Sequence, residues 1–454
     1  MIGRHQVRLG GLVVAFAAAY ALVGLFKHWH FDSSAYDLGI FDQVIWRLSR
    51  FDAPTSSLKG GLNIFGDHFH PIIALLAPVY WIAPRVEALI VAQSVLLAAS
   101  IVPVFAFARR RLPAGQSFAI AIVYALFWGI QRTAWFDFHE LAFAPLLIGI
   151  ALNAIDLRRW RVLWLACAAL CLVKEDMIPL VAGIGAWIFL FVDRRQGLML
   201  AAASLILFPI VMLIVIPGFG HGVWNYGAAF ARLRADPWLA PIIATTPPQK
   251  LFTVILWLVP FMFLPLGSRW SLLAVVVALE RLLSDSPTHW GSGAHYSAPL
   301  APILAAGAAD TLSRIRTAVE NAKGRRWVVP ALLTLMVVAS ATLPGHQPVM
   351  RLFAAKHYRD VPDRAAAAEA LAQIPRDASV VAQAAIVPHL SHRDRIYMLE
   401  DGAPEADFVI AASSRVSPWP ASSPEVVDAW LEQRRQAGYR EIFTKDGWVV
   451  LRRP

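Results

Sequence analysis

Two aspartates, Asp37 and Asp42, follow the first long apolar run of the sequence at a spacing of five residues. An ionised carboxylate next to a membrane is costly unless it is paired or solvated, which makes each of them a candidate for chemistry. The chemistry that suits such a group is general-base catalysis, in which it takes a proton from a substrate hydroxyl. A structural explanation carries equal weight for both. Ser34 and Asp37 fit a helix capping box, and Asp42 would be a solvated residue on the polar face of a surface helix.

Imidazole and carboxylate groups gather in two further polar segments, residues 67–70 and 136–140. The candidate substrate-binding side chains there are His68, His70, Asp137, His139 and Glu140. Such groups bind a divalent metal ion or orient a phosphate, and His68, His70 and Glu140 are the candidate metal ligands. The spacing matches no strong metal signature, and a polar turn before a helix that begins at Pro71 is the favoured interpretation of the first segment. A divalent metal ion is therefore the candidate cofactor, although the sequence does not require one.

A third polar turn, Lys174-Glu175-Asp176, joins two apolar runs. Its lysine is suited to hold a phosphate, and its two carboxylates are suited to bind sugar hydroxyls or a metal ion. The alternative is the polar turn of a tight hairpin, in which the lysine extends its ammonium to the membrane surface. The other candidates for binding a substrate are Arg132, His289 and His295.

Long apolar runs must position these polar segments. Hydrophobic residues make up 57% of the 454 residues and charged residues only 16%, whereas a water-soluble domain carries about a quarter charged residues. Many runs are long enough to cross a membrane, among them 9–26, 86–108, 198–216 and 327–343. We therefore expect residues 1–345 to form a polytopic α-helical membrane protein with about eleven transmembrane helices. The segment 72–83 is either a further crossing or a re-entrant segment.

The net charge of +10 reflects membrane topology and not a nucleic-acid partner. The basic residues cluster in alternate loops, at 109–111, 158–161, 194–195 and 314–326. Because Lys and Arg accumulate in cytoplasmic loops, this pattern predicts a cytoplasmic N-terminus in a cell membrane. The partner is then the lipid bilayer, and a large first loop, residues 27–85, lies on the outer side together with the other polar segments.

The composition changes from about residue 350, where charges of both signs mix with interrupted apolar residues. We expect residues 350–454 to form a small, soluble, extracytoplasmic α/β domain. The pattern predicts helices at 365–374 and 424–437, strands at 379–382, 395–398 and 407–411, and a hairpin at 442–451. The hairpin is expected to turn at Asp446-Gly447.

The chain resembles a prokaryotic membrane family known as domain of unknown function 2079. The resemblance rests on Asp37-Leu38-Gly39-Ile40-Phe41-Asp42-Gln43, His68-Phe69-His70-Pro71, Lys174-Glu175-Asp176, and a tail motif that runs from Ala382 to Arg393 and is followed by Ile396-Tyr397. It covers nearly the whole chain. That family is similar in turn to the GT-C superfamily of membrane glycosyltransferases, which includes protein mannosyltransferases and aminoarabinose transferases.

The resemblance implies a GT-C-like fold and a glycosyltransferase that takes a sugar from a polyprenyl-phosphate donor with inversion. In that superfamily an acidic residue of the first outer loop serves the reaction; Asp37 occupies the matching place, and Asp42 is the neighbouring candidate. Lys174, Arg132, Arg232 or a metal ion would stabilise the leaving phosphate. The double-acid signature of the mannosyltransferases is absent, since the five residues from Tyr36 read Tyr-Asp-Leu-Gly-Ile. The sugar and the acceptor (a glycan, a lipid or a protein) therefore do not carry over.

Two other functions compete with this interpretation. A transporter or lipid flippase would also place acids and histidines in a helical bundle, as a proton relay. Transporters often contain two related halves with ionisable residues near the membrane midplane, whereas this sequence has no internal repeat and its ionisable residues lie at the outer helix ends. The third possibility is a non-catalytic scaffold whose soluble tail is a binding module.

Overall fold

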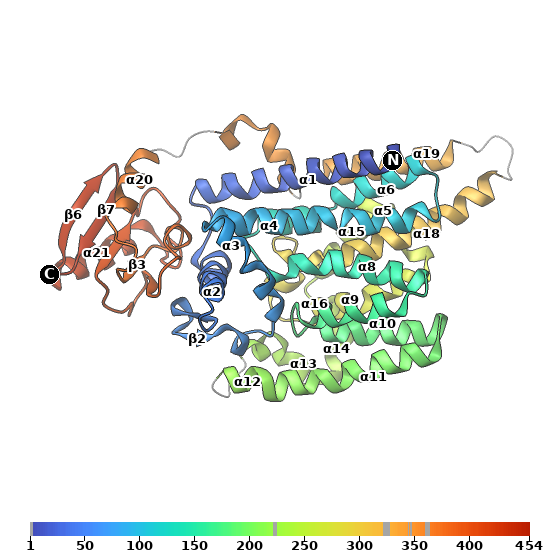
Figure 1. Cartoon of the computed structure of the whole chain (residues 1–454), viewed down its shortest axis with the longest axis horizontal. Coiled ribbons are helices and arrows are strands. Elements are labelled where there is room, and N and C mark those ends of the chain that lie inside the picture. Colours follow the sequence, from blue (N-terminus) through green and yellow to red (C-terminus); the bar gives the residue numbers. More distant parts are fainter. Residues whose placement is uncertain (1–2, 221–224, 321–326, 344, 346, 359–363) are drawn as a thin grey trace.

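The computed structural model describes residues 3–454 except 221–224, 321–326, 344, 346 and 359–363. Long helices lie side by side in one body, and the C-terminal residues form a small separate domain at one end of that body (Figure 1). The N-terminus lies at the opposite end (Figure 1). The described residues thus form a helical body and a small C-terminal α/β domain.

The helical body contains most of the chain. Its longer helices are α1 (Arg4–Trp29), α4 (Val86–Ala99), α5 (Ile101–Arg109), α6 (Ala114–Ala125), α7 (Trp128–Trp135), α8 (Ala144–Asp156), α9 (Trp160–Cys171), α10 (Met177–Phe191), α11 (Arg194–Ile210), α15 (Gln249–Leu258), α16 (Ala274–Leu282), α18 (Leu300–Glu320) and α19 (Val328–Thr342). The shorter ones are α12 (Ile216–Phe219), α13 (Ala231–Ala235), α14 (Ala240–Thr245) and α17 (Pro287–Trp290). Local capping marks some ends: Asp193 accepts a hydrogen bond from the backbone of Gln196 and so starts α11.

Fewer helices span a membrane by length and composition than the sequence led us to expect. Within the described residues, three do so: α1, the continuous run Val86–Arg109, and the run Arg194–Phe219. Two bent pairs would bring the number to five. Other apolar runs form helices that are too short for a hydrocarbon core about 30 Å thick, such as α9 with 12 residues and α10 with 15. The segment expected as a crossing or a re-entrant turn forms two short helices, η4 (Pro71–Leu76) and α3 (Val79–Ile82).

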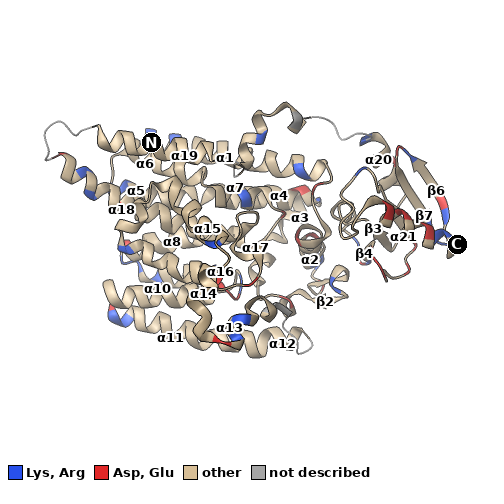
Figure 2. Ribbon diagram, turned by 180° about the vertical axis from the view of Figure 1, so that it is seen from behind, with Lys and Arg blue, Asp and Glu red and all other residues tan. Residues whose placement is uncertain are grey.

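Charge is distributed unequally along the helices. Figure 2 shows Lys and Arg at the end of the body that lies away from the C-terminal domain. Arg110 and Arg111 both bind the carboxylate of Asp156 there, at 2.6 Å. The polar segments that contain the candidate site residues lie at the other end, which faces the domain.

The first loop connects α1 to α4 at the domain-bearing end. It contains η1 (Ala35–Gly39), α2 (Ile40–Ser49), β1 (Thr55–Ser56), η2 (Ser57–Lys59), β2 (Leu62–Asn63) and η3 (Ile64–Gly66) before η4 and α3. The surface helix expected in this loop is α2, whose buried apolar residues include Phe41 and Ile45. The capping box between Ser34 and Asp37 does not form: the Ser34 side chain caps nothing, and its backbone N–H binds Asp137 at 2.8 Å instead.

The C-terminal domain is a five-stranded sheet between two helices. Its strands are β3 (Val380–Ala382), β4 (Ile396–Met398), β5 (Phe408–Ala411), β6 (Arg440–Lys445) and β7 (Trp448–Arg452), in the order β4-β3-β5-β7-β6. Strand β3 is parallel to β4 and β5, and β7 is antiparallel to β5 and β6. The helix α20 (Arg364–Ala372) packs on one face of the sheet, and α21 (Pro424–Gln436) on the other. Each predicted element of this domain is confirmed, including the hairpin turn at Asp446-Gly447.

The domain is fastened to the first loop by side chains of α2. The amide of Gln43 donates hydrogen bonds to the backbone oxygen of Arg393 and to the hydroxyl of Ser57, both at 2.9 Å. Ser57 in turn bonds to both backbone groups of Ile396, at the start of β4. Gly39 packs so closely against Val387 that a Cβ there would lie 2.9 Å from the valine side chain. The loop that carries the two candidate aspartates is therefore held from the domain side.

Candidate active site

Asp37 lies in a strained turn. Its backbone angles are φ 66° and ψ −87°, close to the classical γ-turn that side chains other than glycine rarely adopt. Strain of this kind costs on the order of 1–3 kcal/mol and persists only when surrounding structure imposes it. The Asp37 carboxylate accepts no hydrogen bond from any described residue, although the residue is half-buried. A strained backbone that presents an unpaired carboxylate is typical of a functional residue.

The environment of Asp37 raises its proton affinity. Burial and the negative charge of Asp137 raise the pKa of the Asp37 carboxyl to about 6, against the opposing effect of Lys174, Lys27 and Lys59. The carboxylate therefore gains or loses its proton close to neutral pH, where the group is most effective as a general base.

Asp137 supports the turn and is itself fully paired. One of its oxygens lies 2.7 Å from the ammonium of Lys27 at the end of α1, and the other accepts the backbone N–H of Ser34. These contacts tie the end of α1 and the start of the first loop to the segment between α7 and α8. Asp137 was a candidate substrate ligand in the sequence; the structure places it beneath the Asp37 turn.

Lys174 and Glu140 form a buried pair. Lys174 Nζ lies 3.6 Å from Glu140 Oε1, and the two side chains are 6% and 0% exposed. Burial raises the pKa of Glu140 to about 8 in spite of the lysine. Burial alone would lower the pKa of Lys174, but Glu140 and Asp176 raise it, so the lysine stays charged. Since 3.6 Å exceeds hydrogen-bond distance, the Lys174 ammonium makes no hydrogen bond with the part of the chain that the structure describes.

Glu175 joins the Lys174 turn to the end of the first loop. Its carboxylate lies 2.5 Å from Nδ1 of His68 and accepts the backbone N–H of Phe69 at 2.9 Å. Although burial would raise it, the charges of His68 and Lys174 lower the pKa of Glu175 to about 2. Glu175 is therefore ionised and holds His68 in place.

A cavity of about 170 Å³ opens beside these groups. Its polar lining consists of His68, Lys174, Glu175, Asp176, Glu280, His289 and Tyr296, and its apolar lining includes Phe208, Met212 and Phe230. Burial raises the pKa of Asp176 to about 6, and one oxygen of this carboxylate is buried without a hydrogen-bond partner in the described structure. Burial lowers the pKa of His289 to about 4, and its ring nitrogen lies 2.9 Å from the Ser284 hydroxyl.

Four of the groups gathered here were not singled out in the sequence: Lys27, Lys59, Glu280 and Tyr296. A usable signal existed for Glu280, which together with Arg281 interrupts an apolar run, because ionisable residues in such runs are functional candidates. The other three gave no signal, since basic and aromatic residues are common at the ends of membrane helices.

The remaining histidines form a buried aromatic group next to the cavity. The rings of His139 and His295 stack with centroids 3.6 Å apart, and His70 packs against Phe41 and Phe65. Burial lowers the pKa of all three histidines, so their rings are neutral. Within the described residues, no group of three or more His, Cys, Asp or Glu side chains is arranged to hold a metal ion. The candidate metal ligands His68, His70 and Glu140 thus do not form a ready metal site.

Asp42 and Arg132 lie away from this cluster. Asp42 is fully buried against the C-terminal domain, where Tyr80, Ser391 and His392 bind its carboxylate. Arg132 donates to the backbone oxygen of Gly345. The other sequence candidates, from Asp37 to His295, gather at the domain-bearing end of the helices.

These features are those of a membrane protein whose polar cluster lies within the helical body, next to its first loop. Residues 27–450 match the family described as "Predicted membrane protein (DUF2079)", and the chain belongs to this family. No curated protein matches the sequence.

The fold is similar to that of ArnT from Cupriavidus metallidurans, whose crystal structure has undecaprenyl phosphate bound. The TM-score is 0.56 at 13% sequence identity, and the similarity covers 97% of this chain and 98% of that one. At this level of identity the similarity shows a shared fold.

Proposed function

We propose that this protein is a GT-C-type membrane glycosyltransferase that transfers a sugar from a polyprenyl-phosphate donor to an extracytoplasmic acceptor. The observation that carries the proposal is that a candidate base and a candidate phosphate ligand lie near each other at one end of the helices. There, an unpaired carboxylate on a strained turn, Asp37, lies close enough to an unbonded buried ammonium, Lys174, for the two charges to interact. The likeness of fold to ArnT, solved with undecaprenyl phosphate bound, supports the choice of donor.

Asp37 is the proposed general base. The acceptor hydroxyl attacks the anomeric carbon of the donor sugar from the side opposite the phosphate, and Asp37 takes the hydroxyl proton. The new glycosidic bond forms as the bond between the anomeric carbon and the phosphate oxygen breaks. The polyprenyl phosphate leaves with the electron pair, and the anomeric configuration is inverted.

Lys174 is the proposed phosphate ligand. Its ammonium lines the cavity and has no hydrogen bond to a described residue, so it can donate to phosphate oxygens. Glu140 competes with the phosphate for this lysine, but a carboxyl group with a pKa of about 8 is mostly protonated at neutral pH. Binding of the phosphate therefore displaces little negative charge. No step is assigned to a metal ion.

The lipid chain of the donor has a route to the cavity. Phe208 and Met212 line it from α11 and the adjoining η6 (Val211–Val215). The same helix exposes large apolar side chains, among them Leu205, Ile210 and Leu213. An isoprenoid chain lying along α11 would leave its phosphate at Lys174.

The charge distribution supports an extracytoplasmic site. The Lys and Arg clusters lie at the end of the helices opposite the C-terminal domain (Figure 2). If that end faces the cytoplasm, as the preference for Lys and Arg in cytoplasmic loops predicts, the Asp37 cluster and the domain lie outside.

The test is transfer from radiolabelled polyprenyl-phosphate sugars in membranes that contain equal amounts of each variant. We expect Asp37→Asn to abolish transfer, because the amide takes up no proton at neutral pH. Asp401→Asn is the control: Asp401 is exposed in the C-terminal domain, lines neither cavity and should be silent. Transfer that survives in Asp37→Asn would overturn the assignment of the base. A wild-type protein that transfers no sugar from a broad donor panel would favour the transporter instead.

A further inference from the structure

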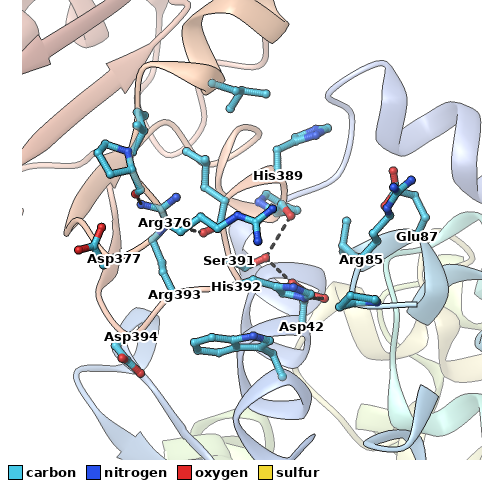
Figure 3. A pocket seen from close by; sticks show the side chains of 18 of the residues that line it. Asp42, Arg85, Glu87, Arg376, Asp377, His389, Ser391, His392, Arg393 and Asp394 are labelled. Carbon is cyan, nitrogen blue, oxygen red and sulfur yellow. Dashed lines mark hydrogen bonds and ion pairs between the residues drawn. The ribbon is translucent and has the colours of Figure 1, made fainter. Parts of the chain in front are cut away.

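A second and larger cavity lies between the helical body and the C-terminal domain. Its volume is about 1220 Å³, and it shares no lining residue with the cavity at Lys174. Its body wall comes from the end of α1, from α2 and from the start of α4. Its domain wall comes from residues 371–377 and 388–394 (Figure 3). The reaction described above uses none of these side chains.

Some polar groups in the walls already have partners. Asp42 is bound by Ser391 and His392. The guanidinium of Arg393 donates to three backbone oxygens of its own domain, and Asp394 pairs with Arg47 at 2.9 Å. These groups hold the walls together and have little capacity left for a ligand.

Three other arginines that line the cavity are not held by the contacts that fasten its walls. The guanidinium groups of Arg85 and Arg376 make no hydrogen bond or ion pair with any described residue, and Figure 3 shows these two arginines on the body side and the domain side respectively. Arg50 lies over the ring of Trp46 at 4.7 Å, and a carboxylate of Asp52 lies 3.6 Å from it. Guanidinium groups of this kind bind phosphate or carboxylate through paired N–H donors.

Hydrogen-bonding groups of other types complete the lining. Glu87 and Asp377 contribute carboxylates, and Trp29 donates to Glu87 only at 3.5 Å. The rings of His28 and His389 stack at 4.0 Å, and one nitrogen of each is buried without a hydrogen-bond partner among the described residues. His28 is 1% exposed, so its unpaired nitrogen can be satisfied only from within the wall or from the cavity.

We propose that this cavity binds the acceptor, and that the acceptor is an anionic saccharide, a sugar chain that carries phosphate or carboxylate groups. The arginines bind the anionic groups, and the carboxylates and imidazoles bind the hydroxyls. A bare polyanion fits less well because it would also meet Glu87 and Asp377. The volume exceeds that of most small-molecule sites, which are about 300–1,000 Å³, and so accommodates several sugar rings.

Each cavity then binds the substrate that its lining suits. The cavity at Lys174 has an apolar wall from α11, which suits a lipid-linked donor, whereas the cavity at the domain is lined by polar groups. Asp42 belongs to the second cavity and stands five residues after Asp37 on the same loop. The identification of the ligand as the acceptor rests on the proposed function, whereas the binding of an anionic saccharide does not.

The first experiment measures binding to the full-length protein in detergent by isothermal titration calorimetry. The probes are trehalose 6-phosphate, trigalacturonate, neutral trehalose and inorganic phosphate. We expect saturable binding of either or both anionic sugars, at least about tenfold tighter than binding of trehalose or phosphate. The absence of saturable binding of both anionic sugars, or binding of trehalose or inorganic phosphate as tight as that of the better anionic sugar, would overturn the proposal.

Variants locate the binding. Arg85→Gln and Arg376→Gln should each weaken binding of the anionic sugar by about tenfold, because each removes one charged donor. Arg440→Gln, at an exposed position on β6, is the control and should leave binding unchanged. Binding that is unaffected by both cavity variants would place the ligand elsewhere and overturn the proposal.

A second readout separates this inference from the proposed reaction. Asp37→Asn should bind the anionic sugar as well as wild type does, because Asp37 does not line this cavity. If wild type transfers sugar and the bound anionic saccharide competes with the acceptor, the assignment as acceptor site is supported. If transfer is active and the bound saccharide neither competes nor becomes labelled, that assignment is overturned.

Discussion

The Asp42 carboxylate on α2 lies 3.1 Å from Nε2 of His392 on the C-terminal domain. Asp42 has no exposed surface, and it also accepts hydrogen bonds from the hydroxyls of Tyr80 and Ser391. A buried carboxylate needs such partners, since desolvation without them costs several kcal/mol. The contact therefore couples the position of the domain to the loop that contains Asp37, and it gives Asp42 a structural role at this interface.

The first prediction concerns this contact. Asp42→Asn should destabilise the docked domain by about 2 kcal/mol, because hydrogen bonds to a buried charge are replaced by weaker neutral ones. The measurement is the unfolding midpoint of the purified protein together with its sensitivity to limited proteolysis. Asp394→Asn is the control: its ion pair with Arg47 lies in the same interface, but the side chain is 64% exposed, and the loss should be below about 1 kcal/mol. Equal effects of the two variants would contradict the special role of Asp42.

The second prediction is that docking of the domain weakens as pH rises. Burial would lower the pKa of His392, but Asp42 and Glu87 raise it above the ordinary value, against a smaller effect of Arg376. A group whose pKa is raised on folding contributes stability at low pH and loses it as pH rises through the folded-state pKa. Protection of the domain from proteolysis should therefore be greatest near pH 6 and decline above it. His392→Gln should remove this pH dependence; a slope unchanged in that variant would contradict the prediction.

The sequence predicted local structure well where local signals decide it. The C-terminal domain follows from alternating apolar residues and from the Asp446-Gly447 turn, and its elements match within two residues or so. The number of membrane crossings was harder to predict from the sequence. Short apolar runs form bent or interrupted helices such as the α6–α7 pair, which bends by 45°. Hydrophobicity identifies these runs but does not determine where tertiary packing breaks a helix.

The sequence predicted which residues form the site better than it predicted how they are arranged. Sequence reasoning found Lys174, Glu175 and His68, which the structure brings together. It did not separate Asp37 from Asp42, because the Ser391 that binds Asp42 lies 349 residues later in the chain. The same limit applies to the Asp37 turn, where a local capping box was plausible.

The third prediction tests whether Lys174 has a role beyond charge balance. Lys174→Met should abolish transfer, because it removes the proposed phosphate ligand, and it should cost little stability, because Glu140, with a pKa of about 8, is mostly protonated at neutral pH. Adding Glu140→Gln removes the neighbouring carboxyl group as well and should not restore transfer. Thermal unfolding and transfer are measured on both variants. A double variant that regains transfer would show that Lys174 serves only to neutralise Glu140.

The fourth prediction concerns the pH dependence of transfer. The base must be ionised, so kcat/KM should fall on the acid side with an apparent pKa of about 6, the value raised by burial and by Asp137. Asp137→Asn removes that negative charge and leaves Lys27 unpaired, and both changes lower the pKa of Asp37. The acid limb should therefore move to lower pH, while the amide oxygen still accepts the N–H of Ser34. An acid limb that stays in place or moves to higher pH would exclude Asp37 as the titrating base.

The last prediction separates the backbone strain at Asp37 from its chemistry. Glycine adopts a positive φ readily, so Asp37→Gly should remove the strain that the φ of 66° imposes, whereas Asp37→Ala retains it. Both variants lack the carboxylate and should be inactive. The glycine variant should nevertheless be the more stable of the two, by about 1 kcal/mol, when their unfolding midpoints are compared. Equal stability would mean that the turn relaxes without the carboxylate, and the strain would then not be imposed by the loop and the domain that holds it. A more stable but inactive glycine variant would show that this protein retains a costly backbone conformation to present a carboxylate.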